Sequence, residues 1–343
     1  MSTLPTQPSA ETSYWSFFSS SRYLHGVASV LHAAQAVTVL ALALWLDGRS
    51  PSSSTQTAAP GKAEIFKGGR VQLYRAATRW LTSSTNSSFP PTVYTELLPY
   101  GELDIRYLIF AFFALSAMSH TFTLALSNDG RAGKLRYIEY SVSASVMVLA
   151  IASEAGIRDA YTLAAQFTLT WVTMLLGIVS ELVHEAYAHD VPWLWLAPHV
   201  TAWATCLVAY APILDVFLLN SSTPSTPPPP STEYASPPDF VRVIVFLEFG
   251  MFMSFGFVQL YALSSKTANA AARGYQPPAS ASGEGSDQWR GLIHPHHLNV
   301  THDPVSGDDE AIDDAAESAY IGLSLLAKTL LGWIVLSPLL ASI

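Results

Sequence analysis

The sequence predicts an all-α integral membrane protein, built as a bundle of seven transmembrane helices. Half of the 343 residues are hydrophobic and only 13% are charged, and the mean hydropathy is +0.28. Such a composition is typical of a chain that crosses a membrane several times, not of a soluble domain. A transmembrane helix needs about twenty mostly apolar residues. The stretches that meet this requirement are 23–46, 104–126, 135–156, 161–188, 193–219, 240–263 and 316–340.

The sequence predicts a seven-helix domain over residues 23–341, and the segments outside the spans differ in composition. Residues 1–22 are polar and lack the basic start of a cleaved signal peptide. The long loop 47–103 contains a stretch, 63–80, that we expect to order as a strand pair or as a surface helix. The Pro-rich stretch 221–238 predicts an extended linker. The loop 264–315, rich in Gly, Ser, His and acidic residues, predicts disorder.

Charge favours a cytoplasmic N-terminus. In that orientation the short inside segments carry four basic residues and the short outside segments carry two, which agrees with the excess of positive charge on cytoplasmic loops. The glycosylation sequons that begin at Asn86 and Asn220 would then both lie outside. Seven spans place loop 47–103 and the C-terminus outside, and loop 264–315 in the cytoplasm. The six basic residues are Arg22, Arg131, Lys134 and Arg136 inside, and Arg158 and Arg242 outside.

The balance of charges and the cysteine count exclude several kinds of site. The formal net charge is −9, and much of it comes from the acidic run 308–317, so no basic patch predicts nucleic-acid binding. Cys206 is the only cysteine, which rules out an intrachain disulfide and a cysteine-based metal site. Four histidines in 294–302 have the composition of metal ligands, but the loop around them predicts disorder, and we expect no metal site.

Lys328 is the basic residue near the middle of the last span. An ammonium group in hydrocarbon costs several kcal/mol, so it requires a counter-charge or chemistry that changes it. A desolvated lysine with a lowered pKa is also the side chain that condenses with an aldehyde to form a Schiff base. Lys328 is therefore the first candidate functional residue.

Glu139 is the candidate partner of Lys328. The third and seventh spans run in the same direction, and at 1.5 Å per residue Glu139 lies roughly 6 Å from the start of its helix and Lys328 roughly 18 Å from its own. Long helical side chains lean toward the N-terminus, which brings the lysine nitrogen toward the carboxylate. A Glu139–Lys328 pair is thus geometrically possible. The alternative is an interfacial Glu139 that pairs with Arg136.

Polar side chains recur at helical spacing on four spans. Residues three or four apart share a helix face, and stripes of this kind line internal polar cavities, although serines also serve as close-packing residues between membrane helices. The pairs are His32 with Gln35, Ser116 with His120, Glu139 with Ser143, and Ser324 with Lys328.

Carboxylates and aromatic residues inside the spans are further candidates. Ionisable residues within a membrane are expensive and functional by default, which singles out Glu154, Glu181 and Glu248. Aromatic residues such as Trp171, Phe249 and Tyr320 would form a slot for an apolar ligand, or would be ordinary core and lipid-facing side chains.

Seven spans with one lysine midway along the last resemble the layout of retinal proteins. Animal-type opsins fit poorly, because no Asn-Pro-x-x-Tyr follows Lys328 and no second cysteine exists for their disulfide. The segment 136–147, RYIEYSVSASVM, instead resembles the heliorhodopsins of the microbial-type rhodopsin superfamily. The resemblance covers all seven spans, and that family has the same inverted orientation and a partly β-structured, extracellular first loop. Supporting matches are His32 and Gln35, Leu115-Ser116 with His120, Glu181, and Ser324 with Lys328.

The resemblance implies a cofactor and roles for particular residues. All-trans retinal would be linked covalently to Lys328 as a protonated Schiff base, with Glu139 as sole counterion. The implied protein is a photoreceptor and not an enzyme, in the plasma membrane, with membrane lipid around it, a homodimeric assembly and a cytoplasmic signalling partner. Ser324 and Ser143 would hydrogen-bond near the Schiff base, a polar cavity would contain His32, Gln35, Ser116, His120 and Tyr140, and Trp171, Phe249 and Tyr320 would line the retinal pocket.

The same comparison separates three functions. Outward proton pumps of the superfamily carry a carboxylate donor eleven residues after the acceptor, where this chain has Ala150, and a second counterion four before the lysine, where it has Ser324. A slow light sensor is therefore the leading hypothesis. The alternatives are a light-gated proton conductance that uses Glu181, Glu154 and Glu248 as a relay, and a transporter without retinal that uses a Glu139–Lys328 ion pair.

Overall fold

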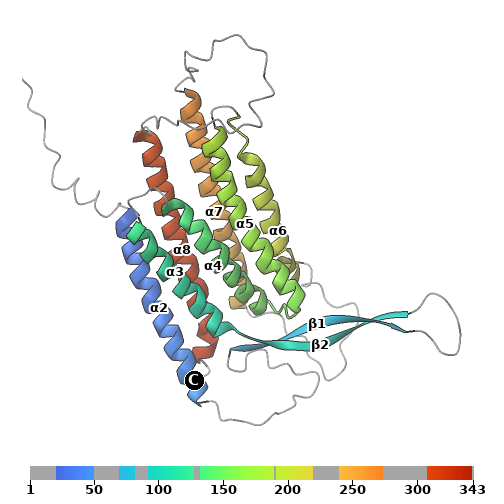
Figure 1. Cartoon of the computed structure of the whole chain (residues 1–343). Helices are drawn as coiled ribbons and strands as arrows, with labels where there is room; N and C mark the ends of the chain where they lie inside the picture. Colours follow the sequence, from blue (N-terminus) through green and yellow to red (C-terminus); the bar gives the residue numbers. More distant parts are fainter. Residues whose placement is uncertain are drawn as a thin grey trace, which may run out of the picture.

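The computed structural model describes residues 21–49, 69–81, 92–126, 132–188, 191–218, 239–272 and 307–341. The Pro-rich segment 221–238, the histidines of 294–302 and the sequons at Asn86 and Asn220 lie outside these ranges. Seven helices lie side by side in a bundle, and a two-stranded ribbon projects from one end of it (Figure 1). In chain order the elements are α2 (Ser21–Arg49), β1 (Arg70–Leu81), β2 (Thr92–Asp104), α3 (Ile105–Leu126), α4 (Ala132–Glu154), α5 (Ala160–Tyr187), α6 (Leu196–Leu218), α7 (Asp239–Ala272) and α8 (Gly307–Ala341).

The seven predicted spans are confirmed. Each helix in the described part of the chain contains a stretch long and apolar enough to cross a membrane. The helices α2, α4, α6 and α8 begin at the end of the bundle away from the ribbon, and the other three run the opposite way (Figure 1). We call these two ends the hairpin end and the opposite end. The chain is therefore an integral, multi-pass membrane protein.

The last two helices are longer than predicted, and the expected disorder of 264–315 is wrong at both of its ends. Helix α7 continues to Ala272 and α8 begins already at Gly307. Polar contacts hold the extra turns together: Lys266 forms an ion pair with Asp313, and Asn269 Nδ2 donates to Asp309 Oδ1 at 3.2 Å. Hydropathy detects only the apolar, membrane-crossing part of a helix, so it does not predict these polar turns.

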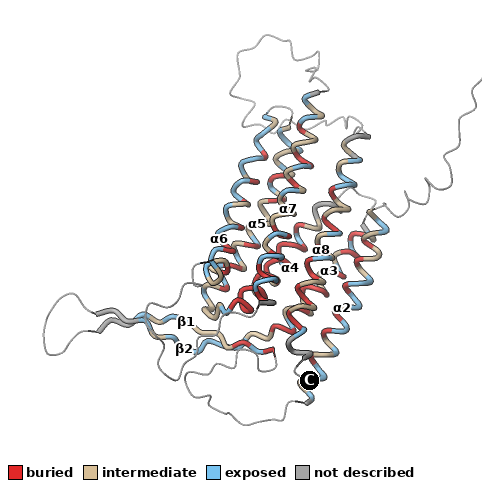
Figure 2. The backbone as a smooth tube through the Cα atoms, turned by 180° about the vertical axis from the view of Figure 1, so that it is seen from behind, coloured by how far each residue is buried: buried red, intermediate tan, exposed pale blue. Residues whose placement is uncertain are grey.

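Helices α4 and α8 form the centre of the bundle. In their most apolar stretches 67% and 50% of the residues are buried, against at most 33% in the other five helices. Figure 2 shows the buried residues gathered on the inward faces of the helices. Close approach supports this packing, because a Cβ at Gly332 of α8 would lie 2.6 Å from the Phe113 ring of α3. The two helices that carry Lys328 and Glu139 are thus the best shielded from lipid.

The loop between the first two spans contains β-structure, as expected. Strands β1 and β2 pair antiparallel from Arg70 with Asp104 to Leu81 with Thr92, and the register shifts between Leu73 and Tyr74. The strand pair is built from 70–81 and 92–104, so the predicted stretch 63–80 supplies only one of its strands.

Arg106 fastens the base of this hairpin to the bundle. Its guanidinium is almost fully buried and donates from Nη2 to Asp104 Oδ2 at 2.6 Å and to Asp47 Oδ1 at 2.9 Å. Asp47 lies in the last turn of α2 and Asp104 ends β2, so one side chain ties the helix to the strand. The backbone N–H of Ile105 also donates to the Gly69 carbonyl at 2.9 Å. A second anchor is the backbone N–H of Tyr74, which donates to the Arg158 carbonyl between α4 and α5 at 2.9 Å.

We expect Gly69→Ala to destabilise the protein. Gly69 has a φ of +82°, and a Cβ there would lie 2.9 Å from Arg106 Cγ. A strained backbone of this kind costs about 1–3 kcal/mol, which thermal unfolding of the purified protein in detergent will detect. The matched control is Gly26→Ala in α2, where a Cβ meets nothing within 4 Å and alanine favours helix. Equal unfolding midpoints in the two variants would contradict this account of Gly69.

Candidate functional site

Lys328 and Glu139 form a buried ion pair at the centre of the bundle. Lys328 Nζ lies 2.7 Å from Glu139 Oε1, and the two side chains are 3% and 5% exposed. The pairing follows from the parallel course of α4 and α8 and from the lean of the lysine toward the start of its helix. Of the two arrangements left open by the sequence, the structure has the pair across the bundle. No hydrogen bond or ion pair joins Glu139 to Arg136 in the described part of the chain.

Ser116 of α3 is the third member of this group. Its hydroxyl accepts from Lys328 Nζ, and it donates either to Glu139 Oε1 at 2.7 Å or to the Phe112 carbonyl at 2.9 Å. The hydroxyl therefore bridges the two charges. A charge-assisted hydrogen bond of this type is worth roughly twice a neutral one.

The predicted polar residues of α2 and α3 gather beside the ion pair. His32 is fully buried and its Nδ1 lies 3.1 Å from Gln35 Oε1. Gln35 Nε2 donates to Thr329 of α8, the residue after the lysine, at 2.8 Å. The rings of His32 and His120 stack with centroids 5.8 Å apart and planes 8° from parallel. Nε2 of both histidines has no protein partner in the described residues, and water commonly satisfies such groups in a polar interior.

Two residues that the sequence analysis missed extend this group toward the opposite end. His25 Nδ1 lies 2.8 Å from His120 Nδ1, and His25 Nε2 lies 3.2 Å from Glu317 Oε1. Glu317 also pairs with Arg136, whose Nη2 donates to Glu181 Oε1 at 2.8 Å. We call Arg136, Glu181, Glu317 and His25 the ion cluster. Glu317 precedes Lys328 by eleven residues, about three helical turns, so its place on the same face of α8 was readable from spacing.

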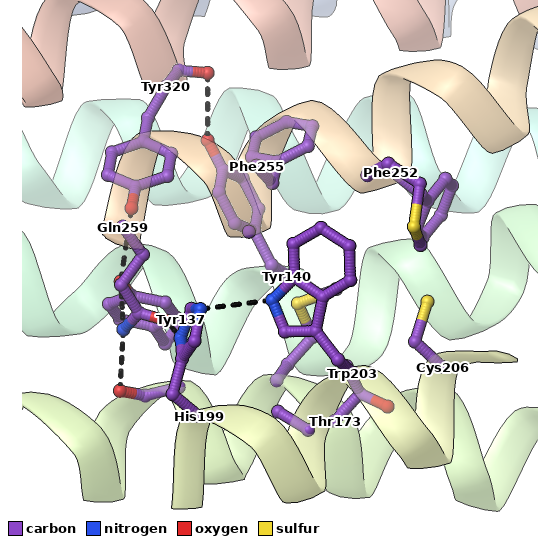
Figure 3. Close-up of a pocket in the computed structure, with 15 residues that line it drawn as sticks. Tyr137, Tyr140, Thr173, His199, Trp203, Cys206, Phe252, Phe255, Gln259 and Tyr320 are labelled. Carbon is purple, nitrogen blue, oxygen red and sulfur yellow. Dashed lines mark hydrogen bonds between the residues drawn. The ribbon is translucent and has the colours of Figure 1, made fainter. Parts of the chain in front are cut away.

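A cavity opens on the other side of Lys328 and continues away from it. The compartment at the lysine is the smaller one, and the neighbouring compartment is the larger. Tyr140, Met174, Phe252 and Phe255 line both, so the two compartments adjoin one another. The first is also lined by Ser143, Ala144, Met147, Ser324 and Ala327; the second extends to Tyr137, Thr173, Gly177, His199, Ala202, Trp203, Cys206, Met253, Gly256, Gln259 and Tyr320 (Figure 3).

The structure places some predicted residues in this cavity and others elsewhere. Tyr320 lines the larger compartment, as expected of a pocket residue, and Ser143 and Ser324 line the smaller one without a hydrogen bond among the described residues. Tyr140 belongs to the apolar cavity and not to the polar group, and its ring lies 5.0 Å from Lys328 Nζ. The aromatic lining residue of this cavity that the sequence analysis missed is Trp203 on α6.

Two of the three predicted pocket aromatics lie outside both compartments. Trp171 is 40% exposed on the outer surface of α5, because it follows the buried Thr170 and is rotated by about 100° from that inward face. Phe249 packs against Tyr210 with ring centroids 5.3 Å apart. Aromatic identity alone does not reveal the phase of a helix that is apolar on every side.

The three candidate relay carboxylates are not joined to one another. Glu181 belongs to the ion cluster, whereas Glu154 and Glu248 lie toward the hairpin end, buried to 6% and 1% exposure. Both oxygens of Glu248 and Oε2 of Glu154 lack a hydrogen-bond partner in the described part of the chain. Glu154 lies near Arg158 in the loop before α5, and burial lowers the pKa of the Arg158 guanidinium.

Comparison with known proteins identifies one family. The family model described as Heliorhodopsin matches residues 22–268, which is well over half of the chain and includes α2 to α7. Lys328 on α8 lies beyond the matched region. No curated protein matches the sequence.

Proposed function

The chain belongs to the heliorhodopsin family, and from this premise of a retinal-binding, light-sensing rhodopsin we propose that it is a slow photoreceptor. In this proposal all-trans retinal is attached to Lys328 as a protonated Schiff base, and Glu139 is the counterion. The observation that carries the proposal is the position of Lys328 Nζ, which contacts Glu139 at 2.7 Å and borders the apolar cavity.

The residues around Lys328 fit a long apolar polyene. The two compartments are lined mainly by aromatic and aliphatic side chains from α4 to α8, as is typical of sites for apolar small molecules. Retinal, when bound, would supply visible absorption and a light-driven change of shape. Phe252, Phe255 and Tyr140 would hold the chain between them, and the unpartnered hydroxyls of Ser143 and Ser324 lie within the lysine compartment.

Glu139 and Ser116 would keep the positive charge at the nitrogen. Opposite charges a few ångströms apart attract strongly in a low-dielectric interior, so the carboxylate favours the protonated form and localises its charge. After Glu139 itself, the buried histidines His32 and His120 are further groups on that side that can take up a proton. Gln35, hydrogen-bonded to Thr329, would orient His32.

A sensor is favoured over a pump because α4 has no carboxylate at the position of the proton donor. Eleven residues after Glu139 stands Ala150, which is fully buried and cannot donate. Glu154 and Glu248 have no hydrogen-bonded connection to Lys328 among the described residues. Slow return of the proton gives a long-lived active state, which suits a signal and not rapid transport.

Glu248 favours one alternative, a light-gated proton conductance. A carboxylate with 1% exposure and no partner is expensive to keep charged in an apolar bundle, so Glu248 is expected to hold a proton that it can release. We further propose that the opposite end faces the cytoplasm and a signalling partner there, that the hairpin end is extracellular at the plasma membrane, and that the chain forms homodimers.

Replacing Lys328 by Ala is expected to abolish the visible absorption band that forms when all-trans retinal is added to membranes containing the protein. The reason is the loss of the only amine in the cavity lining. Absorption spectroscopy makes the measurement, and far-ultraviolet circular dichroism checks that the helices remain. A band that persists unchanged in the variant, or no band in the wild type, would refute the attachment.

Replacing Glu139 by Gln is expected to move the band far to the red. The neutral amide keeps the shape of the side chain but no longer stabilises charge at the nitrogen, so the gap between ground and excited states narrows. Glu181→Gln is the matched control, because Glu181 pairs with Arg136 and not with Lys328. If both variants absorb where the wild type does, another group is the counterion.

Voltage-clamp recording under continuous light distinguishes the sensor from the conductance. We expect no sustained photocurrent in cells that express the protein and carry retinal. A sustained current that reverses with the proton gradient would overturn the pure sensor, and its disappearance in Glu248→Gln would assign the path to α7.

A further inference from the structure

A chain of side-chain hydrogen bonds leads from the apolar cavity to the ion cluster. Trp203 Nε1 on α6 lies 3.0 Å from His199 Nε2, and His199 Nδ1 lies 3.2 Å from Gln259 Oε1 on α7. Gln259 Nε2 lies 2.9 Å from the Tyr137 hydroxyl on α4, which is 2.7 Å from Glu181 Oε1 on α5. Figure 3 shows the first four of these side chains together at one edge of the cavity.

The hydrogen-bond partners of His199, Gln259 and Trp203, determine which of its ring nitrogens carries the hydrogen. Gln259 Nε2 lies 2.8 Å from the Gly177 carbonyl, which can only accept, so the amide nitrogen must face it. Gln259 Oε1 then faces His199, and Nδ1 of the imidazole must carry the hydrogen. Trp203, at the other end, can only donate, so Nε2 must be bare. Both ends demand the same neutral tautomer.

Every bond in the chain consequently points the same way. The Tyr137 hydroxyl accepts from Gln259 and has one hydrogen left, which it donates to the Glu181 carboxylate. Arg136 Nη2 donates to the same oxygen, Glu181 Oε1, at 2.8 Å. Aligned hydrogen bonds polarise one another. A change in the hydrogen bond that Trp203 donates therefore alters how strongly the Tyr137 hydroxyl is polarised toward Glu181, and with it the electrostatic interaction between Glu181 and Arg136.

Trp203 is placed to detect what occupies the cavity. It lines the compartment beyond the residues shared with Lys328, and its indole lies so close to α7 that a Cβ at Gly256 would come within 2.8 Å of it. Its ring also packs edge-on against Phe257, with centroids 4.8 Å apart. With α7 behind it, the indole cannot yield to pressure from the cavity without changing its hydrogen bond to His199.

The ion cluster carries the connection to the remaining helices. Arg136 contacts Glu317 on α8, Glu317 contacts His25 on α2, and His25 contacts His120 on α3. All seven helices therefore contribute to one continuous set of polar contacts, which starts at the cavity and ends beside the Lys328 group.

We propose that Trp203, His199 and Gln259 are positioning residues that transmit displacement of the chromophore end remote from Lys328, through Tyr137, to the Arg136–Glu181 pair. The proposal rests on the retinal function argued above. It adds a second output route, separate from proton transfer at Lys328, and assigns it to α6 and α7.

The direction of the hydrogen bonds through His199 can be tested in the dark and without retinal. In full-length protein labelled with ¹⁵N-histidine, and assigned with His199→Phe, nitrogen NMR should show His199 neutral with hydrogen on Nδ1. A charged His199, or hydrogen on Nε2, would overturn the chain. This result does not depend on chromophore binding, so it fails separately from the proposed function.

The transmission is tested by light-minus-dark infrared spectra of the retinal-loaded protein with ring-¹³C tyrosine, normalised to bound chromophore. We expect a tyrosine difference band that Tyr137→Phe removes, and loss of that band in Trp203→Phe, which keeps an aromatic ring but lacks the N–H donor. Trp195→Phe is the matched control, since Trp195, in the turn that leads into α6, also donates one bond, to Thr267 Oγ1 at 3.2 Å, but lines neither compartment.

Retention of the Tyr137 band in Trp203→Phe, or its absence from the wild type, would refute transmission along this route. Loss of the band in Trp195→Phe as well would mean that general loosening of α6 is responsible, and would also refute it. Gln259→Met, which removes the middle link with a side chain of similar shape, should repeat the loss if Trp203→Phe does not fold.

Discussion

A lysine ammonium in the middle of an apolar bundle is tolerated only beside an opposite charge, and Lys328 meets this condition through Glu139 at 2.7 Å. The requirement determines much of the architecture. It sets α4 against α8, gives both helices the best-buried positions, and draws Ser116 of α3 between the charges. The same lysine that contacts the carboxylate also lines one end of the apolar cavity, together with Tyr140 and Phe252.

The carboxylates of the bundle fall into two groups that differ in their surroundings. Toward the opposite end Glu139, Glu181 and Glu317 each contact a cation, so their charge is compensated. Toward the hairpin end Glu248 has no partner among the described residues, and only Arg158 lies near Glu154. The three carboxylates of the first group are therefore compensated by cations, whereas Glu248 of the second group is not paired among the described residues.

The sequence predicted the centres of all seven helices, because hydropathy is a property of short segments, and it left the Glu139–Lys328 pair as one of two possible arrangements. It failed where the answer depends on the phase of one helix against another. Trp171 and Phe249 are aromatic, as a pocket for an apolar ligand requires, but the helix faces on which they lie place them outside the cavity. Trp203 on α6 is aromatic and also lines the cavity. His25 was overlooked since its role comes from Glu317, nearly three hundred residues away. The polar turns that lengthen α7 and α8 depend on mutual contacts such as Lys266 with Asp313, which neither segment reveals alone.

Those additional turns have a mechanical consequence. At 1.5 Å per residue, helices of 34 and 35 residues are about 50 Å long, whereas the hydrocarbon layer is about 30 Å thick. At the opposite end α7 and α8 are cross-linked by side-chain contacts, and α7 extends beyond the other helices there (Figure 1). A rigid rod pivoting near the depth of Lys328 sweeps a wider arc at its tip than at its centre. If the linked pair tilted about that depth, its polar tip would move further than the residues beside Lys328.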